Sequence, residues 1–193
     1  MENVARAERA DAFHEALNIF EQAGYTVDHV VLNASYVGVP QRRKRLITFG
    51  SVTPSFVTQL RKNLEANLDS KETTVRDWFG ERLNTDFYYR HPRSYARRAI
   101  FSVDEPSPTI RGVNRPIPVG YPGHPGDAAG VEKARPLTTE ERAEIQTFPS
   151  GFRFVGSKTA TEQMIGNAVP VKLAKYVADN LRKIILESHL SVN

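Results

Sequence analysis

The stretch Asn33-Ala-Ser-Tyr-Val-Gly-Val-Pro-Gln-Arg-Arg-Lys-Arg-Leu-Ile-Thr-Phe-Gly50 joins a turn, a row of cations and a strand-forming apolar run. Because side chains alternate across a strand, a strand that begins near Arg43 directs Arg43 and Arg45 to one face and Arg42 and Lys44 to the other. The planar fork of an arginine suits a phosphate or a base edge. Composition alone favours a solvated strand end, because runs of charge usually lie on solvated faces.

The residues on both sides of this stretch predict an α/β arrangement. From residue 6 to residue 23 apolar side chains recur at helical spacing, and Gly24 stands where such a helix ends. Residues 25–32 and residues 45–50 are rich in strand formers, so we expect two strands that could pair as neighbours. Residues 54–68 predict a further helix.

Composition bounds the class of protein. With 193 residues and 40% hydrophobic residues, the chain can bury a core as one domain or one domain plus an appendage. It has neither an apolar run long enough to span a bilayer nor the apolar centre of a signal peptide, so we expect a cytoplasmic protein without membrane contact. The net charge of +4 favours an anionic partner. Cysteine is absent, which excludes a cysteine nucleophile and a thiolate metal site. His29 has no second histidine or carboxylate at ligand spacing beside it, and no metal site is predicted.

Residues 74–133 are rich in proline and glycine, which predicts a small separate lobe of short strands and loops. Between Phe87 and Arg115 arginines outnumber acids, lysine is absent, and tyrosines and a histidine are interleaved. Such a mixture of guanidinium, ring and hydroxyl groups can contact DNA phosphates and base edges. An irregular surface lobe without a ligand is the alternative. The sequence does not say which residue would contact a base and which a phosphate among Arg97, Arg98, Arg111, Asn114 and Arg115.

Two helices are expected near the C-terminus. Thr138 and Glu141 have the spacing of a capping box, and Pro149 ends that segment. The run 163–170 is expected to open a second helix with a continuous apolar face. That face comprises Leu173, Ala174, Val177, Ala178, Leu181, Ile184 and Ile185.

Four motifs in order resemble conserved blocks of the cytosine-C5 DNA methyltransferases. The central stretch, read as Asn33-Ala34 followed by Gly38-Val39-Pro40-Gln41-x-Arg43-x-Arg45, resembles the eighth block, and Glu2-Asn3-Val4 resembles the Glu-Asn-Val block. Arg135-x-Leu137-Thr138-x-x-Glu141, continued by Ile145-Gln146-x-Phe148-Pro149, resembles the ninth block. Gln163-Met-Ile-Gly-Asn-Ala-Val-Pro170 resembles the tenth. These blocks span most of the chain.

The resemblance implies catalytic roles for Glu2, Arg43 and Arg45. Glu2 matches the glutamate that assists protonation at cytosine N3, and the two arginines match those near the flipped nucleotide. An acid and a guanidinium beside the ring would stabilise the charge that develops when C6 is attacked.

The resemblance also implies contacts to a cofactor and to DNA. Phe148, Asn167 and Ala168 match contacts to S-adenosylmethionine. The partner would be double-stranded DNA, because the interval between the eighth and ninth blocks is the family's target-recognition segment. Thr109 and Ile110 resemble its Thr-plus-aliphatic element. The DNA contacts expected there are Arg97, Arg98, Thr109, Arg111, Asn114 and Arg115.

The fold class expected is α/β: the C-terminal part of a Rossmann-like methyltransferase sheet plus a small, irregular, mainly β target-recognition lobe. Residues 1–73 would belong to the catalytic domain and residues 74–134 to the recognition lobe. Residues 135–193 would supply a helix of that lobe and a final helix that returns to the catalytic domain.

The family's glycine-containing cofactor loop and its Pro-Cys block precede Glu-Asn-Val, and this sequence holds neither. We therefore expect the chain to be inactive alone and to share the S-adenosylmethionine site with a second polypeptide that carries both elements. A subunit of a split enzyme and a truncated reading frame both agree with this interpretation. The alternative from another class is a non-catalytic DNA-binding or regulatory remnant.

Overall fold

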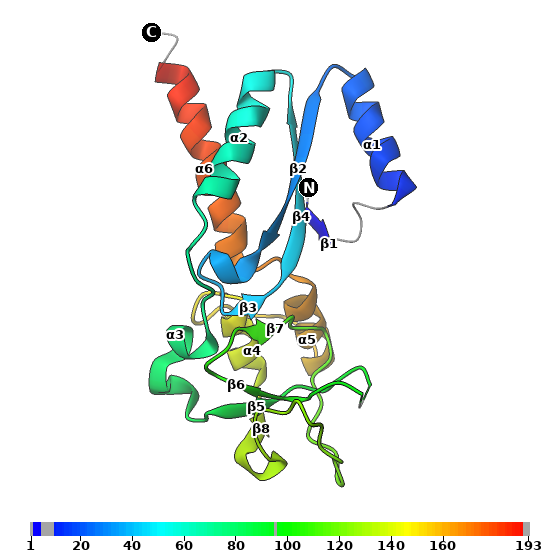
Figure 1. The fold of residues 1–193 in the computed structure, drawn as a ribbon, viewed down its shortest axis with the longest axis vertical. Helices are drawn as coiled ribbons and strands as arrows, with labels where there is room; N and C mark the ends of the chain where they lie inside the picture. Colours follow the sequence, from blue (N-terminus) through cyan, green and yellow to red (C-terminus); the bar gives the residue numbers. More distant parts are fainter. Residues whose placement is uncertain (1, 5–9, 95, 191–193) are drawn as a thin grey trace.

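The computed structural model describes residues 2–4, 10–94 and 96–190, with side chains described for residues 10–94 and 96–187. Two lobes are stacked along the long axis of the molecule (Figure 1). The first lobe contains a three-stranded sheet and the three longest helices, and the second contains two smaller sheets and shorter helices.

The sheet of the first lobe is antiparallel. Strand β4 (Lys44–Ser51) lies between β1 (Glu2–Val4) and β2 (Thr26–Asn33). β2 and β4 pair along their whole lengths, from Thr26 opposite Ser51 to Asn33 opposite Lys44. The two predicted strands and their pairing are therefore confirmed.

Helices cover both faces of this sheet (Figure 1). α1 (Asp11–Gln22) lies on one side, and α2 (Pro54–Ala66) and α6 (Val171–Leu190) lie on the other. Gly24 follows α1 with φ +87°, the left-handed conformation that glycine adopts at helix ends. The predicted first helix is confirmed from residue 11, whereas residues 6–9 of that prediction lie outside the described residues.

The core of the first lobe lies between the sheet and the α2–α6 pair. Val30 and Leu32 of β2 are buried with Leu60 and Leu64 of α2 and with Leu173 of α6. β2 also alternates as a strand should, because the ring of His29 lies on the other side, 5.4 Å from the ring of Phe13 in α1.

The predicted start of the last helix is wrong. Residues up to Asn167 belong to the preceding helix, α5 (Lys158–Asn167), and α6 begins only at Val171. Pro170 explains the break, because a proline disfavours the helical conformation of the residue before it and has no N–H to donate. α5 has already ended at Ala168, its C-cap, whose backbone is extended with φ −62° and ψ 149°.

The predicted continuous apolar face of α6 is only partly buried. Leu173 and Ile184 are buried, whereas Leu181 and Ile185 are exposed. Ala174 and Ala178 are exposed as well. α1 likewise exposes Ile19 and Phe20. The first lobe therefore presents apolar side chains to solvent on both α1 and α6.

The second lobe is built from short elements, as the proline and glycine content predicts. β5 (Phe87–Tyr89) lies between β6 (Ile100–Ser102), which is antiparallel to it, and β8 (Ala134–Pro136), which is parallel. β3 (Gln41–Arg42) pairs in parallel with β7 (Ser107–Pro108) and so connects the central stretch to this lobe. Its short helices include α3 (Val75–Phe79), η3 (Gly80–Leu83), η4 (Val131–Lys133) and α4 (Thr139–Ile145). The short helix η2 (Ala34–Tyr36) follows β2 and packs Ala34 into the core of the first lobe.

The capping box of α4 is confirmed. The backbone N–H of Glu141 donates to the hydroxyl of Thr138 at 3.1 Å, and the N–H of Thr138 donates to the Glu141 carboxylate at 2.8 Å. Arg135 binds the same carboxylate with both arms of its guanidinium. This ion pair links the first turn of α4 to β8. Ala143 and Ile145 of α4 pack into the core of the second lobe.

Candidate functional site

Two buried glutamines join the central stretch to the second lobe. Nε2 of Gln41 donates to Oε1 of Gln146 at 2.9 Å, and Oε1 of Gln41 accepts from the N–H of Ile110 at 2.8 Å. Nε2 of Gln146 donates to the carbonyl of Ile165 in α5 at 2.6 Å. Both side chains are fully buried, so each of these groups needs its partner. The sequence predicts no role for Gln146, because this pairing has no local pattern.

Arg43 reaches two more backbone carbonyls at the same place. Nη1 donates to the carbonyl of Ile110 at 3.0 Å, and Nη2 donates to the carbonyl of Gly166 at 3.1 Å. The residue is 2% exposed, whereas Arg42 and Lys44 are exposed. The predicted alternation of the cation row is confirmed in its burial.

Gly166 and Gly112 bring two backbones into contact beside Arg43. A Cβ atom added to Gly166 would lie 2.1 Å from the backbone nitrogen of Gly112. No side chain fits such a gap, so the segment after Ile110 lies directly on the C-terminal turn of α5. Glycine is required at this close approach.

We expect Gly166→Ala to destabilise the protein by about 1–3 kcal/mol or more, because the added methyl group overpacks a backbone contact that cannot yield. Urea denaturation measures the change. Lys158→Ala, an exposed change in the same helix, serves as the control and should leave stability nearly unaltered. Equal stability of the Gly166→Ala protein and the wild type would contradict the contact.

Arg45 and Glu2 lie on neighbouring strands. In the register of β1 and β4, Val4 lies opposite Arg45 and Glu2 lies opposite Ile47. Nη1 of Arg45 donates to the carbonyl of Lys44 at 2.9 Å, and the residue is half-buried. The side chain of Glu2 lies outside the described residues. The backbone therefore brings these two of the three predicted catalytic positions to one part of the sheet.

The arginines from residue 76 to residue 142 fall into two sets. Members of the first set are ion-paired: Arg76 with Asp104, Arg82 with Glu144, Arg98 with Glu105, Arg135 with Glu141 and Arg142 with Glu162. Members of the second set have no carboxylate at ion-pairing distance among the described residues: Arg90, Arg93, Arg97, Arg111 and Arg115. We call the second set the unpaired arginines.

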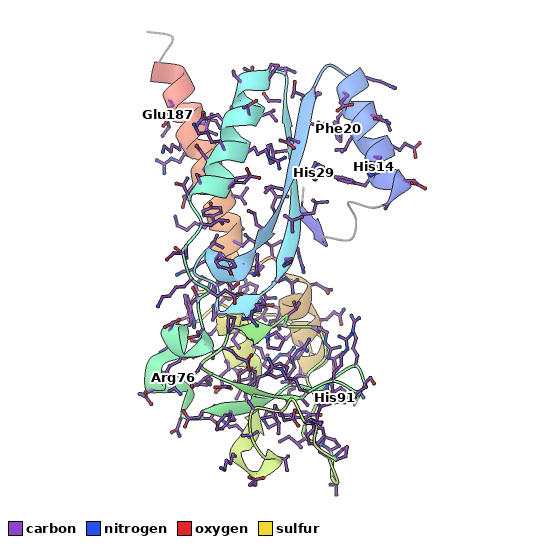
Figure 2. All side chains as sticks on the ribbon, in the orientation of Figure 1. His14, Phe20, His29, Arg76, His91 and Glu187 are labelled. Atoms are coloured by element: carbon purple, nitrogen blue, oxygen red, sulfur yellow. The ribbon has the colours of Figure 1, made fainter. Side chains whose placement is uncertain are left out.

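Electrostatics indicate that the unpaired arginines lie near one another, around His91. Burial, and then Arg93 and Arg97, lower the pKa of Arg111. Burial, and then Arg115 and Arg111, lower the pKa of His91, which lies in the second lobe (Figure 2). Arg111 also donates through Nη2 to the His91 carbonyl. Arg93, Arg97 and Arg115 are exposed, so positive charge is concentrated around His91.

Three of the predicted DNA contacts have internal partners. Arg98 is bound by Glu105 and lies over the ring of Phe101, 4.3 Å from its centroid. The hydroxyl of Thr109 donates to the carbonyl of Arg42 at 2.9 Å. Nδ2 of Asn114 donates to the carbonyl of Leu137 and to Glu162. The remaining predicted DNA contacts, Arg97, Arg111 and Arg115, belong to the unpaired arginines around His91.

Arg142 and Glu162 form a buried ion pair behind this surface. Nε of Arg142 lies 2.8 Å from Oε2 of Glu162, and both side chains are 5% exposed. Arg142 also donates to the carbonyls of Arg111 and Val113. Burial lowers the pKa of Arg142, and the Glu162 carboxylate opposes that shift. This pair holds the segment that carries Arg111, and no sequence pattern indicates it.

The predicted cofactor residues lie on neighbouring segments. Asn167 is exposed at the end of α5, and Ala168 is half-buried. The backbone N–H of Val171, just after these residues, donates to the carbonyl of Gln146 at 3.0 Å. Gln146 lies two residues before Phe148, so this hydrogen bond joins the two segments. Phe148 also lines a cavity of about 1070 Å³ with Phe152 and Phe154. Of the described residues, neither Asn167 nor Ala168 lines that cavity.

Two classes of site find no support in the described part of the chain. No group of three or more histidine, aspartate or glutamate side chains is placed to hold a metal ion. No helix among these residues combines the length and the hydropathy needed to cross a bilayer.

Comparison with known proteins gives one family. A family model of the C-5 cytosine-specific DNA methylases matches residues 1–183. The Type II methyltransferase M.HgiDI of Herpetosiphon aurantiacus is 56% identical over 182 residues, which cover 94% of this chain and 59% of that protein. M.HindV of Haemophilus influenzae is 54% identical over 180 residues, covering 92% of this chain and 59% of that protein. The chain thus spans 59% of the length of these relatives.

Solved structures agree on the fold. The Dnmt2 methyltransferase of S. pombe matches with a TM-score of 0.59 at 15% identity, over 95% of this chain and 66% of that one. A putative DNA modification methyltransferase of an E. coli prophage matches with a TM-score of 0.60 at 16% identity, over 95% of this chain and 68% of that one. The expected fold class, part of a Rossmann-like methyltransferase with a smaller second lobe, is confirmed.

Proposed function

Because the chain belongs to the C-5 cytosine-specific DNA methylases, we propose that it is the C-terminal portion of a DNA (cytosine-5-)-methyltransferase. In this proposal it supplies target recognition and part of the site where a methyl group passes from S-adenosylmethionine to cytosine C5. The observation that supports the proposal is the group of unpaired arginines around His91, whose positive charge favours DNA phosphates.

We propose residues 74–134 as the target-recognition lobe. Arg97, Arg111 and Arg115 are its direct contacts to double-stranded DNA, because no carboxylate of the described chain neutralises them. Arg98, Thr109 and Asn114 shape the same surface through their internal hydrogen bonds. Residues 1–73 then belong to the catalytic domain. Residues 135–193 supply a helix of the recognition lobe and the final helix, α6, which packs on the catalytic domain again.

Glu2 and Arg45 are the proposed catalytic groups of this chain, since β1 and β4 bring their positions close together. Glu2 would protonate cytosine N3, and the guanidinium of Arg45 would stabilise negative charge on the ring. The nucleophile must come from elsewhere, because this sequence has no cysteine.

Asn167, Ala168 and Phe148 fit one wall of a site for S-adenosylmethionine. Asn167 offers an exposed amide, Ala168 permits close approach, and the half-buried ring of Phe148 offers an apolar face. The cofactor supplies the methyl group when bound. These residues would orient its polar and apolar parts, and the rest of the pocket would come from the missing cofactor loop.

We propose a second polypeptide that carries the cofactor loop and the Pro-Cys block as the partner, in the cytoplasm. The exposed Ile19 and Phe20 of α1 on one side of the sheet, and Ile185 and Leu186 of α6 on the other (Figure 1), support this, because adjacent exposed apolar side chains are candidates for an interface. The relatives are Type II methyltransferases, so a place in a restriction–modification system follows.

DNA binding by the chain alone is expected to weaken steeply with salt. Each phosphate contact contributes about 0.9 to the slope of log affinity against log salt concentration, so Arg97→Ala should lower the slope by about one. Arg82→Ala is the matched control, because the Arg82 guanidinium is already paired with Glu144. Fluorescence anisotropy with a duplex measures both slopes. Absence of binding at low salt would refute the proposed recognition lobe.

A further inference from the structure

Three segments far apart in the sequence meet at one buried guanidinium. Arg43 follows β3, Ile110 belongs to the recognition segment 109–114, and Gly166 lies in the last turn of α5. The guanidinium of Arg43 binds the carbonyls of the other two residues, at 3.0 and 3.1 Å. One side chain therefore ties the segment that carries Arg111 to the helix end that carries Asn167.

The surroundings leave this guanidinium little freedom. Arg43 is 2% exposed, and its backbone N–H donates to Oδ1 of Asn33 at 3.1 Å. A charged group at this depth is stable only while its hydrogen bonds are made. Its fork geometry allows two carbonyls to be held at once, which the single ammonium group of a lysine does not reproduce.

The neighbouring contacts reinforce the same tie. The amide pair of Gln41 and Gln146 links Ile110 to Ile165, and the backbones of Gly112 and Gly166 touch. Arg142 holds the far side of the segment through the carbonyls of Arg111 and Val113. The recognition segment is thus bound to α5 at several points around Arg43.

We propose that Arg43 is a positioning residue and not a group that touches the target base: it fixes the recognition segment against the end of α5, so that Arg111 and Asn167 keep one relative position. For its effect on DNA this inference rests on the proposed function. Its structural part, the tie between the two segments, does not.

Hydrogen exchange in the full chain tests the tie directly. We expect Arg43→Lys to accelerate exchange about tenfold in peptides covering both 109–114 and 164–168, because hydrogen bonds from a charged donor are lost at both ends. Arg61→Lys, a charge-preserving change at a surface pair with Asp28, should leave both peptides unchanged. If Arg43→Lys does not fold, Arg43→Gln, which carries no buried charge, replaces it. Acceleration in only one peptide, or in neither, overturns the inference.

A double-mutant cycle tests the consequence for DNA. Arg43→Lys should weaken duplex binding by the chain about tenfold, and should weaken it no further when Arg111 is already replaced by alanine. Additive losses would mean that Arg43 contacts DNA itself and would overturn the positioning role. A wild-type chain that binds no DNA refutes the proposed function, whereas the exchange result then still decides whether the tie exists.

Discussion

Methylation of cytosine in double-stranded DNA is expected only when this chain is mixed with a polypeptide that carries the cofactor loop and the Pro-Cys block. The chain alone should transfer no labelled methyl group, because it contains no cysteine to attack cytosine C6. The mixture should form a stable heterodimer, since the apolar side chains exposed on α1 and α6 become buried. Analytical ultracentrifugation and labelled methyl incorporation measure the two results.

Within that complex, the Arg45→Ala and Arg111→Ala variants should have different defects, one in methyl transfer and the other in DNA recognition. Arg45→Ala should reduce single-turnover methylation by about a hundredfold or more, with DNA affinity nearly unchanged, because its proposed role is to stabilise charge on the flipped base. Arg111→Ala should weaken or relax DNA recognition while methylation of bound DNA stays nearly intact. Lys62→Ala, an exposed change on α2, is the control.

Three outcomes count against these assignments. A mixture that stays inactive although both chains are folded would refute the proposed division of the enzyme between two polypeptides. Interchangeable effects of the two arginine substitutions would refute the separation of a catalytic Arg45 from a recognition Arg111. Methyl transfer by this chain alone would refute the need for a partner.

Loss of the Glu162 carboxylate is expected to lower the stability of the protein strongly. Glu162→Leu leaves the guanidinium of Arg142 buried without its counter-charge, which should cost about 3–5 kcal/mol. Asn114 and Thr139 also lose their shared acceptor on Glu162. Urea denaturation, followed by circular dichroism, measures the change in the free energy of unfolding.

The double variant Arg142→Leu with Glu162→Leu provides the sharper comparison. It removes both charges, so it should recover part of the lost stability, although the carbonyls of Arg111 and Val113 lose their donor. Asp179→Asn, which breaks an exposed pair with Lys175, should change stability very little. A small effect of Glu162→Leu, similar to that of Asp179→Asn, would contradict the importance of the buried pair.

Elements that depend on local chemistry were predictable from the sequence. Gly24 ends α1 because glycine adopts the left-handed backbone without strain, and Thr138 with Glu141 begins α4 because their reciprocal hydrogen bonds span three residues. The pairing of β2 with β4 followed from two strand-forming runs on either side of one turn. The break before α6 also has a local cause, Pro170, but the predicted helix began before that proline.

The partners of the charged and amide side chains depended on tertiary structure. From the sequence, Arg98 and Arg111 are equivalent arginines of one basic segment, and only the fold places Glu105 against the first while leaving the second among other guanidiniums. Gln41 meets Gln146 across 105 positions of the chain, and Arg43 meets Gly166 across 123. Local periodicity carries no information on such pairs, because their geometry exists only once the two lobes have packed together. The sequence by itself therefore determined the family and most of the elements, and the tertiary structure decided which arginines are paired with carboxylates.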